Sequence, residues 1–314
     1  MRLITRQERE LDSRELFKEI EALRKEVDLS NAGYNADKLK LIKKGATPNM
    51  LKAVEAASEK GASNWVTAVP NYDHGTIIHK GDFVDALYIR YGWNILDLAT
   101  ECGCGQPFNL QHALDCPLGG FRLIQHNEAR DLVAKCMREA GFPAVETEPK
   151  LQELTGEVFE YKSAIKDSEA RSDIKCYGFW KPMRQAYFDI KVVTPFARSY
   201  ERQTPAALFK SSELIKIRQY KERIQGVEQA DFTPMVFTCT GGIAPQSLAV
   251  LKRLTERLSE KQNLHYSVVA GWLRTRLSFS LLRSTLLCLR GTRRKKVYCE
   301  NNIELAVNAA RILY

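Results

Sequence analysis

The residues of this chain that are best suited to chemistry lie between Arg171 and Lys191. Asp189 and Lys191 fall in the segment Tyr-Phe-Asp-Ile-Lys-Val-Val, whose aromatic and β-branched residues predict a strand. Side chains two residues apart on a strand point to the same face, so this acid and this base are displayed together. A partly buried pair of this kind is costly unless a charged ligand lies between the two groups. With Asp173 as a second acid, the set is typical of metal-assisted phosphodiester hydrolysis.

A second group of candidate ligands forms the pattern Cys-x-Cys-x7-His-x3-Cys. Its members are Cys102, Cys104, His112 and Cys116. Two thiolates on a glycine-rich turn, followed by a histidine and a cysteine on one short helical turn, can close a tetrahedral zinc site. The other cysteines are scattered, which favours a reducing compartment with one metal site over a disulfide framework. The alternative is a cluster of small buried cysteines without a metal.

The elements that would position these residues follow from hydrophobic periodicity and from turn residues. Helices are expected over 8–28, 47–60, 80–91, 126–140, 211–227, 245–260 and 266–289. Strands are expected over 144–151, around Asp173, over 187–193 and over 232–238. Pro149 places the first of these strands at an edge of the sheet. A turn at 178–182 would join the Asp173 and Asp189 strands into a hairpin.

Two predicted helices carry further candidates for the site. Glu128 lies near the start of the 126–140 helix, from where a carboxylate could reach a metal or a water on it. The alternative is an acid that merely favours the positive end of a helix dipole. Lys216 and Tyr220 are four residues apart and share one helix face, where they would hold a phosphate. The alternative for this pair is an ordinary solvated helix.

Composition limits the class of partner. The chain has 314 residues and a net charge of +9, which suits a polyanion such as DNA. No stretch of 18 apolar residues is present, so we expect no membrane span. The segment Met1–Glu8 is too charged for a signal peptide, and we expect a nuclear or cytoplasmic chain that is not secreted.

The order of these motifs resembles the C-terminal region of non-LTR-type retrotransposon polyproteins, in which a zinc knuckle precedes a restriction-like endonuclease of the PD-(D/E)xK superfamily. The order is Cys-Cys-His-Cys, His-Asn-Glu, Arg-Ser-Asp, Phe-Asp-Ile-Lys-Val-Val and Lys-x3-Tyr. The resemblance implies an α/β fold with a restriction-endonuclease-like core, in which helices flank a mixed sheet. The implied regions are a helical region over 1–60, a connector with the knuckle over 61–120, the nuclease core over 121–245, and C-terminal helices with a basic block over 246–314.

Position by position, the resemblance implies a Mg2+-dependent endonuclease that nicks DNA. Asp173 matches the aspartate of the first motif, Asp189 the second acid and Lys191 the motif lysine. Lys216 and Tyr220 match the downstream lysine and tyrosine. The predicted catalytic residues are Asp173, Asp189, Lys191 and Glu128. The predicted phosphate contacts are Lys216, Tyr220 and Arg171, and the predicted Mg2+ ligands are Asp173, Asp189 and the carbonyl of Ile190. Zn2+ is implied for the knuckle, and DNA and the RNA of the parent element are the implied partners.

One position departs from the family pattern, because Ser172 stands where proline is usual. The chain also contains no Tyr-x-Asp-Asp polymerase motif. Two alternatives to a nuclease therefore stay open. The first is a catalytically inactive, zinc-containing nucleic-acid-binding remnant of a reverse-transcriptase polyprotein. The second is a helical scaffold held by a zinc clip.

Overall fold

The computed structural model describes residues 44–200 and 202–293, with a few positions between 18 and 42. The helix predicted over 8–28 lies outside the described residues at all but three positions. The chain divides into two compact units, Met1–Leu51 and Lys52–Tyr314. The second unit begins within helix α2 (Pro48–Ser58) and contains every element considered below. Among the described helices, none is long and apolar enough to cross a membrane.

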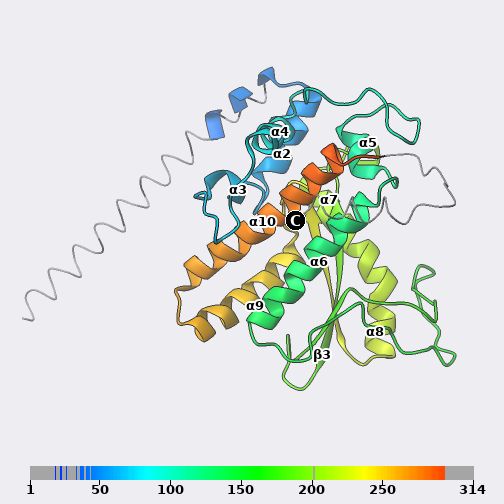
Figure 1. Cartoon of the computed structure of the whole chain (residues 1–314). Coiled ribbons are helices and arrows are strands. Elements are labelled where there is room, and N and C mark those ends of the chain that lie inside the picture. The colour runs from blue at the N-terminus through cyan, green and yellow to red at the C-terminus, as the bar shows by residue number, and fades with distance from the viewer. Residues whose placement is uncertain are drawn as a thin grey trace, which may run out of the picture. The chain divides into compact units, whose positions relative to one another are not determined.

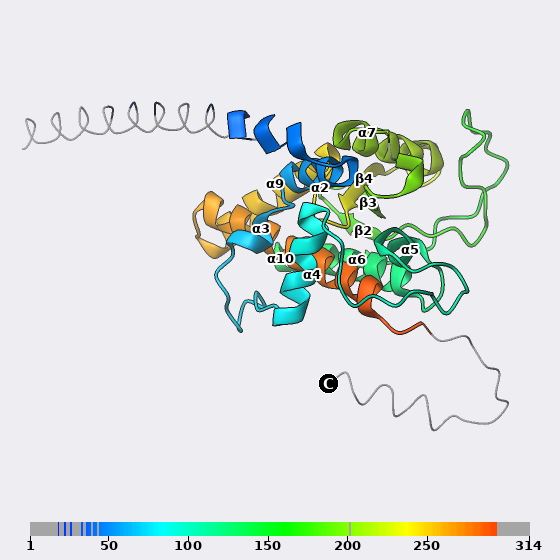
Figure 2. The same cartoon turned by 90° about the horizontal axis from the view of Figure 1, so that it is seen from above.

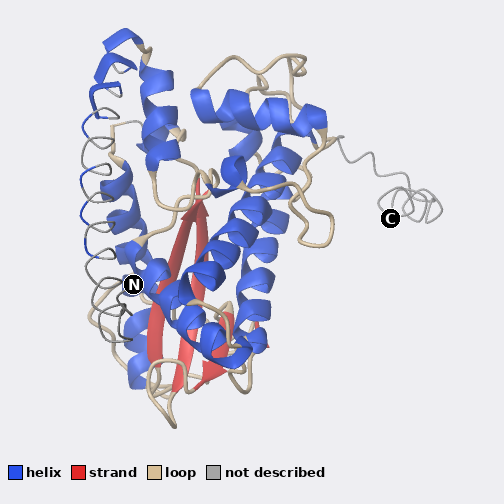
Figure 3. Ribbon diagram, turned by 90° about the vertical axis from the view of Figure 1, so that its left-hand side faces the viewer, coloured by secondary structure: helices blue, strands red, loops and turns tan. Residues whose placement is uncertain are grey.

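The second unit is built on a mixed four-stranded sheet in the order β1-β2-β3-β4. The strands are β1 (Glu146–Thr147), β2 (Ile174–Tyr177), β3 (Gln185–Val193) and β4 (Asp231–Thr238). The first three strands are antiparallel, and β4 runs parallel to β3. The predicted hairpin of β2 and β3 is confirmed, as is a mixed α/β architecture with helices flanking the sheet (Figures 1 and 3).

The strand predicted over 144–151 is much shorter than expected, with only two residues in β1. Ala144 has φ +51° and Glu148 has φ +53°, so left-handed residues interrupt the extended backbone on both sides of β1. An isolated bridge between Lys150 and Arg171 continues the pairing after the break. Glu148 thus sits at a sharp bend beside the start of β2.

The helices follow the predicted order. They are α3 (Asn64–Thr67), α4 (Lys80–Tyr91), α5 (Leu110–Asp115), α6 (Phe121–Glu139), α7 (Pro205–Lys216), α8 (Glu222–Gly226), α9 (Pro245–Gln262) and α10 (Tyr266–Arg290), with a short 3-10 turn η1 (Arg198–Tyr200). Helix α6 begins five residues earlier than predicted because the left-handed Gly120 (φ +72°) is its N-cap. The basic helix predicted over 211–227 consists of α7, a π-helical turn η2 (Ile217–Lys221) and α8.

Alternate side chains of the sheet enter different cores, as the strand pattern predicted. Phe188 and Ile190 of β3 pack with residues of α6, α9 and α10, including Val133, Leu254 and Leu277. Val193 of β3 and Val236 of β4 pack instead with Leu208 and Phe209 of α7. Helices α6, α9 and α10 therefore cover one face, and α7 covers the other (Figure 2). A residue at the end of the β2–β3 ladder lies between these two helical layers and can contact both.

Candidate functional site

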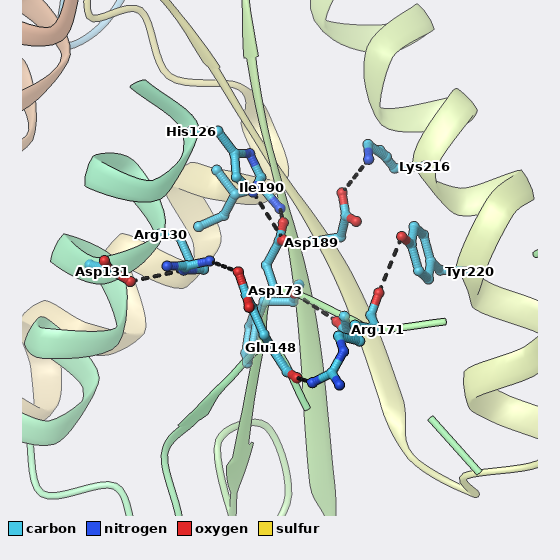
Figure 4. Close-up of polar contacts among 12 residues, drawn as sticks. His126, Arg130, Asp131, Glu148, Arg171, Asp173, Asp189, Ile190, Lys216 and Tyr220 are labelled. Atoms are coloured by element: carbon cyan, nitrogen blue, oxygen red, sulfur yellow. Dashed lines mark hydrogen bonds and ion pairs between the residues drawn. The ribbon is translucent and has the colours of Figure 1, made fainter. Parts of the chain in front are cut away.

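The candidate site lies where the ladder between β2 and β3 ends. The last pair of this ladder is Ile174 with Phe188, and the same register places Asp173 opposite Asp189. The Oδ2 atom of Asp173 accepts a hydrogen bond from the backbone N–H of Ile190 at 2.5 Å. The N–H and C=O of one strand residue point to the same edge, so the Ile190 carbonyl also faces this gap. Figure 4 shows the Asp173 carboxylate beside His126 and Ile190, and the Asp189 carboxylate directed towards Lys216.

Helix α6 contributes His126, the first residue of the His-Asn-Glu motif. The Nε2 atom of His126 lies 3.0 Å from Oδ1 of Asp173. This hydrogen bond, together with the charges of Asp173 and Asp189, raises the pKa of His126 above its ordinary value. The spacing of Ala129 and Val133, both buried against the sheet, already marks the helix face on which His126 lies.

Asp189 faces the other helical layer and is almost fully buried, with 2% of its surface exposed. The ammonium of Lys216 in α7 lies 2.8 Å from Oδ2 of Asp189 and forms an ion pair with it. Burial and the neighbouring Asp173 raise the pKa of Asp189 to about 6, although Lys216 opposes the shift. Burial and the charge of Lys216 lower the pKa of Lys191. The predicted residues Asp173, Asp189, Lys191 and Lys216 are therefore brought together.

The π-helical turn η2 places Tyr220 at the same site. Its hydroxyl donates to the backbone carbonyl of Arg171 at 3.3 Å, and its ring stacks on Phe232 with 5.7 Å between ring centroids. The Lys216 ammonium lies 5.5 Å from the centre of the Tyr220 ring. Burial and the charges of Asp189 and Asp173 raise the pKa of the Tyr220 hydroxyl. Single π-helical turns inside α-helices are frequent at functional sites.

Glu148, the residue directly after β1, lies beside the site, and no sequence pattern singled it out. The Arg130 guanidinium of α6 contacts the carboxylate of Glu148, and its Nε donates to Asp131 at 2.8 Å. The Arg171 guanidinium donates to the Glu148 carbonyl at 3.0 Å. His126 and Arg130 are one turn apart on α6, so one helix face contacts two acids of the sheet (Figure 4).

The placement predicted for Glu128 is wrong. Glu128 is two residues beyond His126, and two residues on an α-helix project about 200° apart. Its side chain is exposed and lines a cavity of about 530 Å³ between α6 and α10, together with residues such as Leu132 and Arg283. The helix side chain that reaches Asp173 is therefore His126.

Glu128→Gln is therefore expected to leave any metal-dependent nuclease activity of the chain within about twofold of the parent, as for surface changes outside a site. The measurement is the initial rate of plasmid nicking at saturating Mg2+, with melting temperature as the check on folding. A loss of tenfold or more in a folded variant would place Glu128 in the reaction.

The predicted zinc ligands come together as a compact cluster. The ligand atoms of Cys102, Cys104, His112 and Cys116 all lie within 4.8 Å of one another. The thiols of Cys102 and Cys116 are 3.8 Å apart, and the Cys104 thiol is 3.3 Å from Nε2 of His112. Tetrahedral zinc with bonds of about 2.3 Å to sulfur requires sulfur atoms about 3.8 Å apart. The three thiols and one imidazole therefore fit a structural Zn2+ site, and the prediction of a Cys3His metal cluster is confirmed to that extent.

The knuckle, defined as residues 101–117, is fixed to the end of α10 by Arg293. This guanidinium donates to the carbonyls of Ala113 and Cys288, and it lies over the rings of Phe108 and Phe121. A Cβ atom on Gly103 would lie 2.2 Å from the Arg293 carbonyl, so this glycine is required for close approach. Arg290, like Arg293, belonged to the predicted basic block, and it pairs with Asp85. Both arginines thus hold the fold together.

The pKa of Asp189 predicts a gain in stability when its charge is removed. A carboxyl whose pKa rises from 3.8 to about 6 on folding holds its proton more tightly in the folded state, so stability falls as pH rises through about 4–6. Asp189→Asn is expected to raise the free energy of unfolding by about 1–3 kcal/mol at pH 8 and by roughly half as much at pH 5.

Urea denaturation at pH 8 and pH 5 measures this difference. The exposed loop residue Asp73 offers the control, since Asp73→Asn should change the free energy of unfolding little, and equally at pH 8 and pH 5. An Asp189→Asn variant less stable than the parent at pH 8 would show that the Lys216 ion pair outweighs the burial cost.

The chain matches no known protein-family model, and no curated protein shows significant similarity to it.

Proposed function

We propose that this chain is a metal-dependent DNA endonuclease of the PD-(D/E)xK type, derived from a retrotransposon polyprotein. The observation that carries the proposal is the meeting of Asp173, Asp189 and Lys191 at the open end of the β2–β3 ladder. Asp173, just before β2, and Asp189 and Lys191 of β3 share a gap that is bounded by α6 and α7. Asp189 lies on the inner strand β3, where burial raises its pKa to about 6, and residues with strongly shifted pKa values concentrate at functional sites.

The oxygen ligands of this gap fit a hard divalent cation such as Mg2+. Asp173, Asp189 and the Ile190 carbonyl would hold it. The bound cation would lower the pKa of a coordinated water and neutralise charge on the scissile phosphate. In the structure the two carboxylates contact the basic side chains of His126 and Lys216, which supports a site for positive charge at this gap.

The remaining residues act on the phosphate and on water. Lys191 makes no ion pair within the described part of the chain, and its lowered pKa eases transfer of a proton to or from water. Lys191 orients the attacking water and stabilises negative charge in the transition state. Lys216, Tyr220 and Arg171 hold the neighbouring phosphates, mainly through contacts that carry no sequence information.

The partner assigned by this proposal is DNA, and the product is a nick in one strand. The net charge of +9 favours a polyanion, and the zinc knuckle stiffens the end of α6 that carries His126. The knuckle has all four positions filled by protein side chains, so its role is structural. RNA of the parent element would bind through the same phosphate contacts.

The test is a nicking assay on supercoiled plasmid with Mg2+, with Mn2+ and without a divalent cation. Conversion to open circles only in the presence of the cation, by a zinc-loaded chain, is the expected result. A contaminating nuclease is controlled for by purifying the Asp173→Asn variant in the same way.

One observation favours the alternative of an inactive nucleic-acid-binding remnant. The two carboxylate oxygens of Asp173 contact His126 and the Ile190 N–H, and the Lys216 ammonium pairs with Asp189. A cation must therefore displace these protein groups before it binds. Salt-dependent DNA binding without cleavage in Mg2+ or Mn2+ would support the remnant.

A further inference from the structure

Glu148 is held next to Asp173 by the sheet itself. The register of β1 with β2 pairs Thr147 with Ile174 and so brings Glu148 opposite Asp173. The backbone N–H of Glu148 donates to the Asp173 carbonyl at 2.9 Å. The neighbouring register brings Asp189 opposite Asp173 on the other side. Glu148 just after β1, Asp173 just before β2 and Asp189 of β3 are therefore aligned in one row of backbone positions.

The backbone of Glu148 is unusual for a side chain of this size. Its φ of +53° lies in the left-handed region, which residues with a Cβ rarely adopt and which is frequently kept at functional sites. The Arg171 guanidinium fixes this bend through the Glu148 carbonyl. The bend directs the carboxylate towards α6, where Arg130 contacts it one turn away from the His126–Asp173 contact (Figure 4).

The charges of the site then follow one rule. Each acid of the row has one basic partner: Arg130 contacts Glu148, His126 contacts Asp173 and Lys216 contacts Asp189. Asp189 is buried, and the Lys216 ammonium is the partner of its Oδ2 atom. Two carboxylates and a carbonyl leave several positions of an octahedral Mg2+ ion to water. A third acid beside them would orient those waters.

We propose that Glu148 is the third carboxylate of this site and binds the same divalent cation, through a coordinated water. The inference rests on the proposed function, because it assumes that Asp173 and Asp189 hold the cation. Acids that bond to metal ligands or to coordinated water typically contribute 10–100-fold to metal affinity. The alternative role for Glu148 is purely structural, as the partner of Arg130.

Isothermal titration of the zinc-loaded full chain with Mn2+ or Mg2+ alone tests this role without relying on activity. Glu148→Gln keeps the shape and an acceptor for Arg130, and we expect it to weaken binding about 10–100-fold. Glu146→Gln is the matched control, since Glu146 lies two residues earlier and pairs with Lys175 away from the row. This control should bind the cation within twofold of the parent.

Arg130→Gln separates the two roles. If Glu148 serves the cation, removal of its competing guanidinium should leave the affinity unchanged or raise it. Equal losses in Arg130→Gln and Glu148→Gln would mean that only their ion pair matters, and the inference would be overturned. An unchanged affinity in a folded Glu148→Gln variant would also overturn it, while loss of binding in Asp173→Asn would still support the nuclease proposal. Unchanged binding in Asp173→Asn would instead remove the proposed function itself.

Discussion

Asp173→Asn is expected to abolish Mg2+-dependent plasmid nicking, with a loss of at least about 10²–10³-fold, the scale for removing one preorganised electrostatic group. Asp173 is the residue on which the site converges, because it contacts both His126 of α6 and the Ile190 N–H of β3. Asparagine keeps the size of the side chain and removes the charge that a cation requires. Initial nicking rates at saturating Mg2+ are the measurement, and Lys191→Ala should cause a comparable loss.

The matched control for this prediction is Glu146→Gln, which removes an acid of the same sheet whose partner is Lys175. Its nicking rate should stay within twofold of the parent. Circular dichroism and melting temperature establish that each variant is folded. Full activity in folded Asp173→Asn and Lys191→Ala variants would refute the assignment of these residues, and the binding remnant would become the better description.

Loss of zinc is expected to destabilise the second unit severely. The knuckle packs Leu114 against Phe121, Cys239 and Cys288, so it joins the start of α6 to the end of α10. Cys104→Ala removes an exposed ligand and hardly any packing, and therefore isolates the contribution of the metal. We expect the variant to lose its zinc and about 3 kcal/mol or more of stability, with a fall in melting temperature of about 6–12 °C.

The measurements are zinc content by atomic emission and thermal unfolding with and without a chelator. Cys136→Ala is the control, because Cys136 is buried in the main core and lies outside the zinc cluster. This control should retain zinc and respond to the chelator as the parent does. A parent protein that contains no zinc after expression in zinc-supplemented medium would favour the alternative of a metal-free cysteine cluster.

Nicking should also decline when zinc is removed. Phe121 begins α6, and His126 lies in the next turn of the same helix. A helix released at its first turn no longer holds His126 at 3.0 Å from Asp173. Since His126 contacts one of the acids, the knuckle is coupled to the site through the position of a single helix.

Local patterns in the sequence determined much of this protein. The alternation of Phe188 and Ile190 with Asp189 and Lys191, and the period of four between Lys216 and Tyr220, depend on neighbours within about one turn or one strand. The zinc pattern consists of two such local pairs, Cys102 with Cys104 and His112 with Cys116. These features appeared in the structure as predicted, since backbone geometry alone sets which side chains share a face.

Only the tertiary structure decided which acids belong to the site. Glu128 and His126 are two residues apart, but the packing of α6 on the sheet directs one to solvent and the other to Asp173. Glu148 enters because a left-handed bend ends β1 and two registers align it with Asp173 and Asp189. Strand register and helix rotation depend on contacts between segments far apart in the chain, and no local pattern encodes them.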